Sequence, residues 1–323
     1  GIWAGVGGVA LPSGPLLGGA LVQTIGWRSV FLINVPIVLA AVLAVRRVVP
    51  PTSGGAGSRL GRARLDRAGV LTGGLALAVG TFAVIETGHR GLDAPVLVAF
   101  AVAGLLLVGF VLVERSRPDP MLPLGLFARP AFSVANAVAA VMNLGTLGLL
   151  FVLTLYLQAV QGRSALAAGV ALLPLFLPLT VLAPIAGRFT SRIGPKPVMA
   201  AGLLTAAIGV ALMARLAPSS DYLVLLPALL CWGIGLGMLT PAVVAAAVGA
   251  VEPARAGLAS GVNNTARQAG GAIGIAVFGA VAGSAVDHDH FVRGLHLTAL
   301  GTAGLFVVAA LATLALVPAA ERV

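Results

Sequence analysis

The segment ALPSGPLLGGAL, residues 10–21, combines apolar side chains with two prolines and three glycines, inside the uncharged run 1–27. In water, this density of Pro and Gly would mark a loop. In lipid, both residues are tolerated inside a helix because neighbouring helices satisfy the freed backbone groups. Ala10, Gly14 and Gly18 recur every four residues, so they share one helix face that allows close packing. We therefore expect a kinked transmembrane helix with one face of small side chains.

The amino-acid composition also indicates a membrane protein. Of the 323 residues, 59% are hydrophobic and only 9% are charged, whereas a soluble domain carries about 25% charged residues. Several uncharged runs reach the ~20 residues that a helix needs to cross a bilayer. These runs are too long and too continuously apolar for the strands of a β-barrel. We predict an all-α polytopic membrane protein, with the lipid bilayer as its main partner.

Ten runs have the length and composition of membrane spans. The net charge of +10 does not indicate nucleic-acid binding, because the basic residues fall between these runs and form no single soluble face. The predicted spans are 1–25, 29–48, 68–88, 94–113, 131–157, 165–187, 197–217, 222–250, 257–283 and 295–317.

The positions of Lys and Arg predict how the spans are oriented. If the arginine-rich loop 49–67 lies in the cytoplasm, the large majority of the 20 basic residues fall on the cytoplasmic side. This topology predicts a multi-pass protein of the plasma (inner) membrane with a cytoplasmic C-terminus. The linker 114–130 contains an apolar patch, MLPLGLF, which is either a segment along the membrane surface or a plain connector.

Ionisable residues inside membrane spans are costly and therefore mark candidate functional sites. Arg267 lies in a predicted span beside Asn263, Asn264 and Gln268. Asn264 precedes Arg267 and Gln268 by three and four residues, so these side chains are expected on one helix face. This polar group lines a cavity or gate, ties two helices together, or marks a helix end that reaches water.

A second polar set lies in the span 131–157 and just beyond it. Asn136 and Asn143 are seven residues apart on one helix face, and Tyr156 and Gln158 follow near its end. A few polar groups among aliphatic walls suit an amphipathic small-molecule substrate. Hydrogen bonding between helices is the alternative interpretation.

Glu86, near the outer end of the third predicted span, is a possible proton site. A carboxyl group held in lipid can take up a proton to avoid burying its charge. A carboxylate this close to a helix end can instead reach water, with His89 and Arg90 near enough to pair with it.

The sequence DHDH (287–290) contains residue types that bind metals. Adjacent residues seldom face one centre, so we interpret the stretch as a solvated external loop and expect no metal site. GIGLGM (233–238) lies within a predicted span and lacks the strand that a nucleotide-binding motif requires. We expect no cofactor, and the absence of a nucleophile or of paired carboxylates in the spans argues against an enzyme.

Several motifs together resemble one family. Gly14-Pro15 and Gly18-Gly19 resemble the antiporter motif in the fifth helix of drug:proton antiporters of the major facilitator superfamily. The other matching segments resemble parts of the fourteen-span branch of these exporters. They are GWRSVFLINVP (26–36), YLQAVQGRSALAAGVALLP (156–174), AGRFTSRIGPKP (186–197) and EPARAGLASGVNNTARQAGGAIGIAVFG (252–279).

The resemblance implies an arrangement of helices and linkers. It implies that the first four helices of the fold precede this chain. By the same resemblance, the chain divides into two helices of the N-terminal bundle (1–48), a cytoplasmic linker (49–67), two extra helices (68–113), a second linker (114–130) and the C-terminal six-helix bundle (131–323).

The resemblance also implies a function, which is export of drugs or antibiotics by alternating access, driven by the proton gradient. The span that contains Asn136 and Asn143 would line the central cavity. A cytoplasmic loop motif would comprise Gly187, Arg188, Arg192, Gly194 and Lys196. The family's loop carries an aspartate where this chain has Thr190 or Ser191. An exporter of an amino acid, siderophore or endogenous metabolite is one alternative, and a transport-inactive membrane scaffold or sensor is another.

Overall fold

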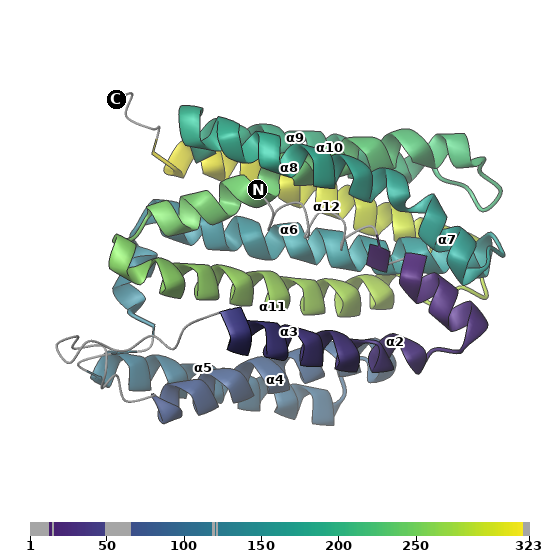
Figure 1. Cartoon of the computed structure of the whole chain (residues 1–323). Helices are drawn as coiled ribbons and strands as arrows, with labels where there is room; N and C mark the ends of the chain where they lie inside the picture. The colour runs from purple at the N-terminus through teal and green to yellow at the C-terminus, as the bar shows by residue number, and fades with distance from the viewer. Residues whose placement is uncertain (1–12, 15, 49–65, 118–119, 121, 319–323) are drawn as a thin grey trace.

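The computed structural model is helical throughout the part it describes, which comprises residues 13–14, 16–48, 66–117, 120 and 122–318. The long helices run side by side (Figure 1), and no strand occurs in these ranges. Eight helices of the described chain are long and apolar enough to cross a membrane. These observations confirm the predicted all-α polytopic fold.

The bounds of the helices give the element order. Before the C-terminal helices lie α2 (Ser29–Leu32), α3 (Asn34–Val48), α4 (Arg67–Arg90), α5 (Ala94–Ser116) and the short 3₁₀ helix η2 (Leu124–Ala128). The C-terminal helices are α6 (Pro130–Leu155), α7 (Ala165–Ala171), α8 (Leu173–Ile193), α9 (Pro195–Leu212), α10 (Tyr222–Gly249), α11 (Ala256–Ala282) and α12 (His288–Leu316).

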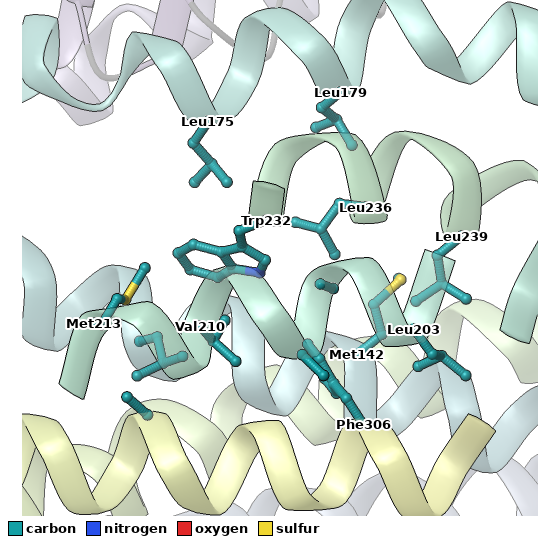
Figure 2. Close-up of a cluster of buried hydrophobic side chains, with 14 of the residues drawn as sticks. Met142, Leu175, Leu179, Leu203, Val210, Met213, Trp232, Leu236, Leu239 and Phe306 are labelled. Carbon is teal, nitrogen blue, oxygen red and sulfur yellow. The ribbon is translucent and has the colours of Figure 1, made fainter. Parts of the chain in front are cut away.

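The core lies among the C-terminal helices. Helix α10 packs against α8 and α9, α12 packs against α9 and α6, and α6 packs against α11. Trp232 of α10 is fully buried, between Leu175 of α8 and Phe306 of α12 (Figure 2). Because lipid is as apolar as these side chains, close packing and interhelical hydrogen bonds hold such helices together.

Small residues allow α11 to lie directly on α6. A Cβ atom added at Gly270 or Gly274 would collide with the backbone carbonyls of Ala140 and Leu144. The two glycines are four residues apart, so they form one small-residue face on α11. This contact fixes the register of α11 against α6 and therefore determines which polar side chains of the two helices meet.

Helices α4 and α5 form a hairpin beside this bundle. Each begins at an aspartate cap, with Asp66 accepting from the backbone N–H of Gly69 and Asp93 from that of Val96. The hairpin packs on α11 through α4. The preceding span is different, because none of the residues 29–47 is buried.

The predicted spans agree with the helices for most of the chain, with two exceptions in their bounds. The span predicted over 165–187 is wrong, because α7 ends at Ala171 and the membrane-length helix runs from Leu173 to Ile193. Pro174 in the first turn of α8 lacks the N–H that would continue α7. The span predicted over 295–317 starts earlier, at His288.

Three further interpretations are corrected or limited by the structure. The external loop predicted at 287–290 is the start of α12, with Asp287 as its cap. Helix α11 is present but is not among the eight membrane-length apolar helices, because its first half is polar. The span 1–25 lies largely outside the described residues, although 16–24 are helical.

The linker 114–130 contains the helix η2 and contacts the bundle. Leu126 is buried with Phe132 and Ala259, and Arg129 donates a hydrogen bond to the backbone oxygen of Ala250 at 2.8 Å. The division of the chain into bundles, linkers and extra helices stays a prediction.

Candidate functional site

The interface between α6 and α11 carries a pair of buried amides. The Nδ2 of Asn263 donates to the Oδ1 of Asn136 at 3.3 Å, and the Nδ2 of Asn136 donates to the backbone oxygen of Phe132 at 2.8 Å. Asn136 is 5% exposed and Asn263 only 2% exposed. Each amide therefore satisfies part of its hydrogen-bonding capacity within the helix pair.

A second polar contact lies about 10 Å further along α6. The Nε of Arg267 donates a long hydrogen bond of 3.5 Å to the Oδ1 of Asn143. Arg267 is half-buried, and no carboxylate of the described residues lies within ion-pair distance of it. The guanidinium therefore carries a charge that is not neutralised within this part of the chain.

These two contacts connect members of both predicted polar sets. We call the four residues the α6–α11 polar ladder: Asn136 and Asn143 of α6, and Asn263 and Arg267 of α11. Asn263 and Arg267 are four residues apart and therefore lie on one face of α11. Asn136 and Asn143 are seven residues apart and lie on one face of α6. The ladder contains hydrogen bonds between the two helices and a half-buried cation, Arg267. A role of these residues in a cavity or gate stays a prediction.

The remaining predicted residues lie elsewhere. Asn264 and Gln268, on the same helix as Arg267, are exposed and are not part of the ladder. Their predicted role stays a prediction. Gln158 is exposed at the far end of α6, about 33 Å along the helix from Asn136. It follows Tyr156 in a π-helical turn (Tyr156–Val160).

A second polar network surrounds this π-helical turn, and the sequence did not identify it. The hydroxyl of Tyr156 donates to the backbone oxygen of Ala217 at 2.6 Å and accepts from the Nε2 of Gln161 at 3.0 Å. The Nε of Arg163 donates to the Oε1 of Gln161 at 3.1 Å, and its guanidinium lies over the ring of Tyr222. The density of polar residues in QAVQGR was the available signal, but their partners are some 60 residues away in sequence.

The antiporter motif is only partly described. Pro15, like Ala10, lies outside the described residues. At Gly14 and Gly18 an added Cβ would meet no described residue within 4 Å, but at Gly19 it would lie 2.8 Å from the backbone oxygen of Ala165 in α7. Gly19 is therefore the motif residue through which the first helix approaches the C-terminal helices.

The cytoplasmic loop motif forms a tight helical hairpin. Helix α8 ends at Ile193 and α9 begins at Pro195, so the loop expected here is reduced to Gly194. Gly194 adopts a φ of +84°, a conformation that side chains with a Cβ rarely adopt. Gly187 lies within α8. The basic side chains of the motif are exposed or half-exposed, at Arg188, Arg192 and Lys196.

Glu86 pairs with a base on its own helix. Its Oε1 lies 2.7 Å from the Nε of Arg90, one turn further on, and its side chain is 26% exposed. The role of Glu86 as a proton site stays a prediction. Among the described residues, no three His, Cys, Asp or Glu side chains form a group that could hold a metal ion.

A cavity of about 840 Å³ lies between the α4–α5 hairpin and α11. Its walls are almost entirely apolar, and Asn136 of the ladder borders it. Among the residues lining it are Gly73 and Leu77 of α4, Leu107 and Phe110 of α5, and Leu258 and Val262 of α11. This volume is in the range of sites that hold drug-sized molecules.

The structure is that of a polytopic helical membrane protein with polar contacts between its helices. Comparison with known proteins identifies the family. The profile of the Major Facilitator Superfamily matches residues 1–275, so the chain belongs to this superfamily. This result confirms the family that the motifs indicated.

Relatives of this chain include several antibiotic-resistance proteins. The chain is 38% identical to the puromycin resistance protein of Streptomyces alboniger, over 89% of the chain and 58% of the relative. It is 34% identical to the methylenomycin A resistance protein of Streptomyces coelicolor, over 90% and 60%. It is 33% identical to the tetracenomycin C resistance and export protein of Streptomyces glaucescens, over 88% and 53%. The chain therefore spans little more than half the length of these relatives.

Proposed function

We propose that the protein to which this chain belongs exports amphipathic, drug-like small molecules across the plasma membrane in exchange for protons. The relatives named for antibiotic resistance and export support this cargo class. The observation in the chain itself that carries the proposal is Arg267, a half-buried cation with no carboxylate partner among the described residues. Such a cation is costly in lipid, so it marks a candidate functional site.

In this proposal, the bundle formed by α6 to α12 rocks against the N-terminal bundle around a site near the membrane midplane. Arg267 binds either the substrate or an acidic group of the opposite bundle. Its binding partner differs between the inward-open and outward-open states. A cation that changes its partner between two states biases the equilibrium between them. Protons that enter from outside neutralise the acidic groups and return the protein to the state that binds cargo.

Transport assays of Arg267 variants test this role. Cells that produce the protein are loaded with ethidium, puromycin or methylenomycin A, and the retained compound is measured after the cells are energised. We expect Arg267→Ala to reduce export at least tenfold and Arg267→Lys to keep part of it, because lysine retains the charge but not the planar guanidinium.

Arg255→Ala is the matched control, since Arg255 is exposed just before α11 and has no ion-pair partner in the described chain. Unchanged export by Arg267→Ala at normal membrane abundance would contradict the role of Arg267. Export of an endogenous metabolite, with no effect on any of the three compounds, would favour the alternative cargo. Absence of transport with every compound would favour the scaffold or sensor.

A further inference from the structure

The apolar cavity between the α4–α5 hairpin and α11 lies where α4 and α11 no longer touch. Near the end of α4 the two helices are in contact, because a Cβ added at Gly88 would lie 3.5 Å from the Cβ of Ala280. Toward the start of α4, the cavity of about 840 Å³ separates them. Leu122, just before η2, and Phe127, within it, border the cavity at that end.

The cavity is about as long as one leaflet of a bilayer is thick. Its lining extends from Gly69 to Gly80 on α4 and from Leu258 to Ala269 on α11. At 1.5 Å per residue, each stretch rises about 16 Å. The hydrocarbon core of a bilayer is about 30 Å thick, so one leaflet contributes about 15 Å. An acyl chain of a membrane lipid spans this distance in its leaflet.

The polar side chains of the cavity wall are already engaged within the protein. None of the described lining residues is charged, and only Asn136 and Thr265 are polar. The amide of Asn136 bonds to Phe132 and Asn263. The hydroxyl of Thr265 donates to the backbone oxygen of Gly261 at 3.0 Å. Polar drug-sized ligands are oriented by a few placed polar groups, so this wall suits a ligand that needs no hydrogen bond.

The cavity has a lateral opening between α5 and α11. Helix α4 packs against both of them, whereas α5 and α11 make no comparable contact with each other. Gly104 of α5 and Gly261 of α11 both line the cavity and are exposed. A Cβ added at either glycine would meet no described residue within 4 Å. A flexible apolar chain can therefore enter sideways from the bilayer.

We propose that this cavity binds one acyl chain of a membrane lipid, which lies on α4 between α5 and α11. Water is a poor occupant, because an apolar cavity offers it too few hydrogen-bond partners. A lipid chain supplies the dispersion contacts that an empty cavity lacks. The headgroup stays at the membrane surface beside η2, so the site recognises the chain and not the headgroup.

The bound chain joins the hairpin to the bundle where their own side chains do not meet. It thereby supports the part of α4 that has no direct contact with α11. This inference does not rest on the proposed export function, because the cavity wall and the lipid are present whether or not the protein moves a cargo.

Native mass spectrometry of the purified protein in detergent tests the site, with dipalmitoyl phosphatidylethanolamine and phosphatidylglycerol as probes. We expect one retained lipid per protein with either headgroup. Gly104→Leu/Gly261→Leu should reduce retention at least tenfold, because both new side chains enter the cavity. Gly109→Leu/Gly257→Leu is the matched control. These glycines lie on the same two helices and have equally open surroundings among the described residues, but they do not line the cavity.

A photoreactive lipid locates the bound chain without any variant. The probe is phosphatidylglycerol with a diazirine at the end of its palmitoyl chain, added at one equivalent per protein. We expect crosslinks at Leu77 and Phe100, which line the cavity away from η2. Val98 and Leu105 serve as internal controls, because they lie on the same helix as Phe100 and are 61% and 72% exposed but do not line the cavity.

Several results would overturn the proposal. Equal retention by the two double variants, equal labelling of lining and control residues, or binding of only one headgroup would show that the cavity does not hold the chain. Displacement of the lipid by puromycin would assign the cavity to cargo. Absence of retained lipid and of cavity crosslinks in the wild type would mean that another part of the full-length protein fills this space.

Discussion

At the scale of single residues, the two contacts of the α6–α11 polar ladder differ in kind. Asn136 and Asn263 are almost completely buried and bond to each other, whereas Arg267 is half-buried and reaches Asn143 only at 3.5 Å. A buried, mutually bonded pair is suited to holding two helices together. A loosely held cation is suited to changing partners, which is the role that we propose for Arg267.

Removing one member of the buried pair should destabilise the protein more than removing both. We expect Asn136→Leu to lower the free energy of unfolding by about 1–3 kcal/mol, because the amide of Asn263 is then buried without its partner. The double variant Asn136→Leu/Asn263→Leu should recover a substantial part of this loss. Unfolding in mixed micelles, followed by helix content, measures the cycle. Strictly additive losses would show that the two amides do not interact.

At the scale of elements, the turn between α8 and α9 depends on a single glycine. Gly194 has a φ of +84°, so Gly194→Ala should cost about 1–2 kcal/mol of stability. Gly187→Ala is the control. Gly187 lies inside α8, and its added Cβ would make an ordinary contact of 3.9 Å with Pro241 of α10. Thermal unfolding in detergent measures both. Equal melting temperatures for the two variants would show that the hairpin does not require this conformation.

The approach of the first helix to α7 also depends on one position. Gly19→Leu should force the first helix away from Ala165 and reduce transport. Gly18→Leu should be tolerated, because no residue that the structure describes lies within 4 Å of its added Cβ. Export assays at equal membrane abundance compare the two variants. Equal damage by both would mean that the small-residue stripe acts as a unit through contacts outside the described residues.

The start of α12 should respond to acid. The hydrogen bond that the backbone N–H of His290 donates to Asp287 holds the pKa of this carboxyl below its usual value. The cap therefore stabilises the first turn at neutral pH, and this contribution is lost as the pH falls through the pKa of the folded state. The protection of the Phe291 amide against hydrogen exchange, relative to its intrinsic rate at each pH, should fall in acid for the wild type but not for Asp287→Asn, which keeps a neutral cap. The same acid dependence in both would contradict this role.

The sequence predicted elements better than contacts. Continuous apolar runs were enough to predict spans such as 222–250, which the structure gives as Tyr222–Gly249. The break at Leu172 was missed because hydropathy does not register a proline at position 174 between two apolar segments. The hydrogen bond between Asn136 and Asn263 depends on how the two helices pack, and a pair so distant in sequence leaves no local pattern.

At the scale of the whole molecule, the described chain has one well-packed part and one open part. The helices around Trp232 bury a continuous core, whereas no residue of 29–47 is buried and an apolar cavity separates much of the α4–α5 hairpin from α11. Apolar surface of this extent must face lipid or other helices. Two parts that pack loosely against each other suit a protein whose halves move during transport.

Substrate-triggered proton movement is the most direct test of proton-coupled export. Inverted membrane vesicles that contain the protein are given an acidic interior, and the internal pH is followed after addition of ethidium or puromycin. The proposal predicts immediate alkalinisation of the interior as protons leave in exchange for substrate, with loss of the response in Arg267→Ala and retention in Arg255→Ala. Substrate accumulation without any change in internal pH, or no response beyond that of vesicles lacking the protein, would contradict proton-coupled export.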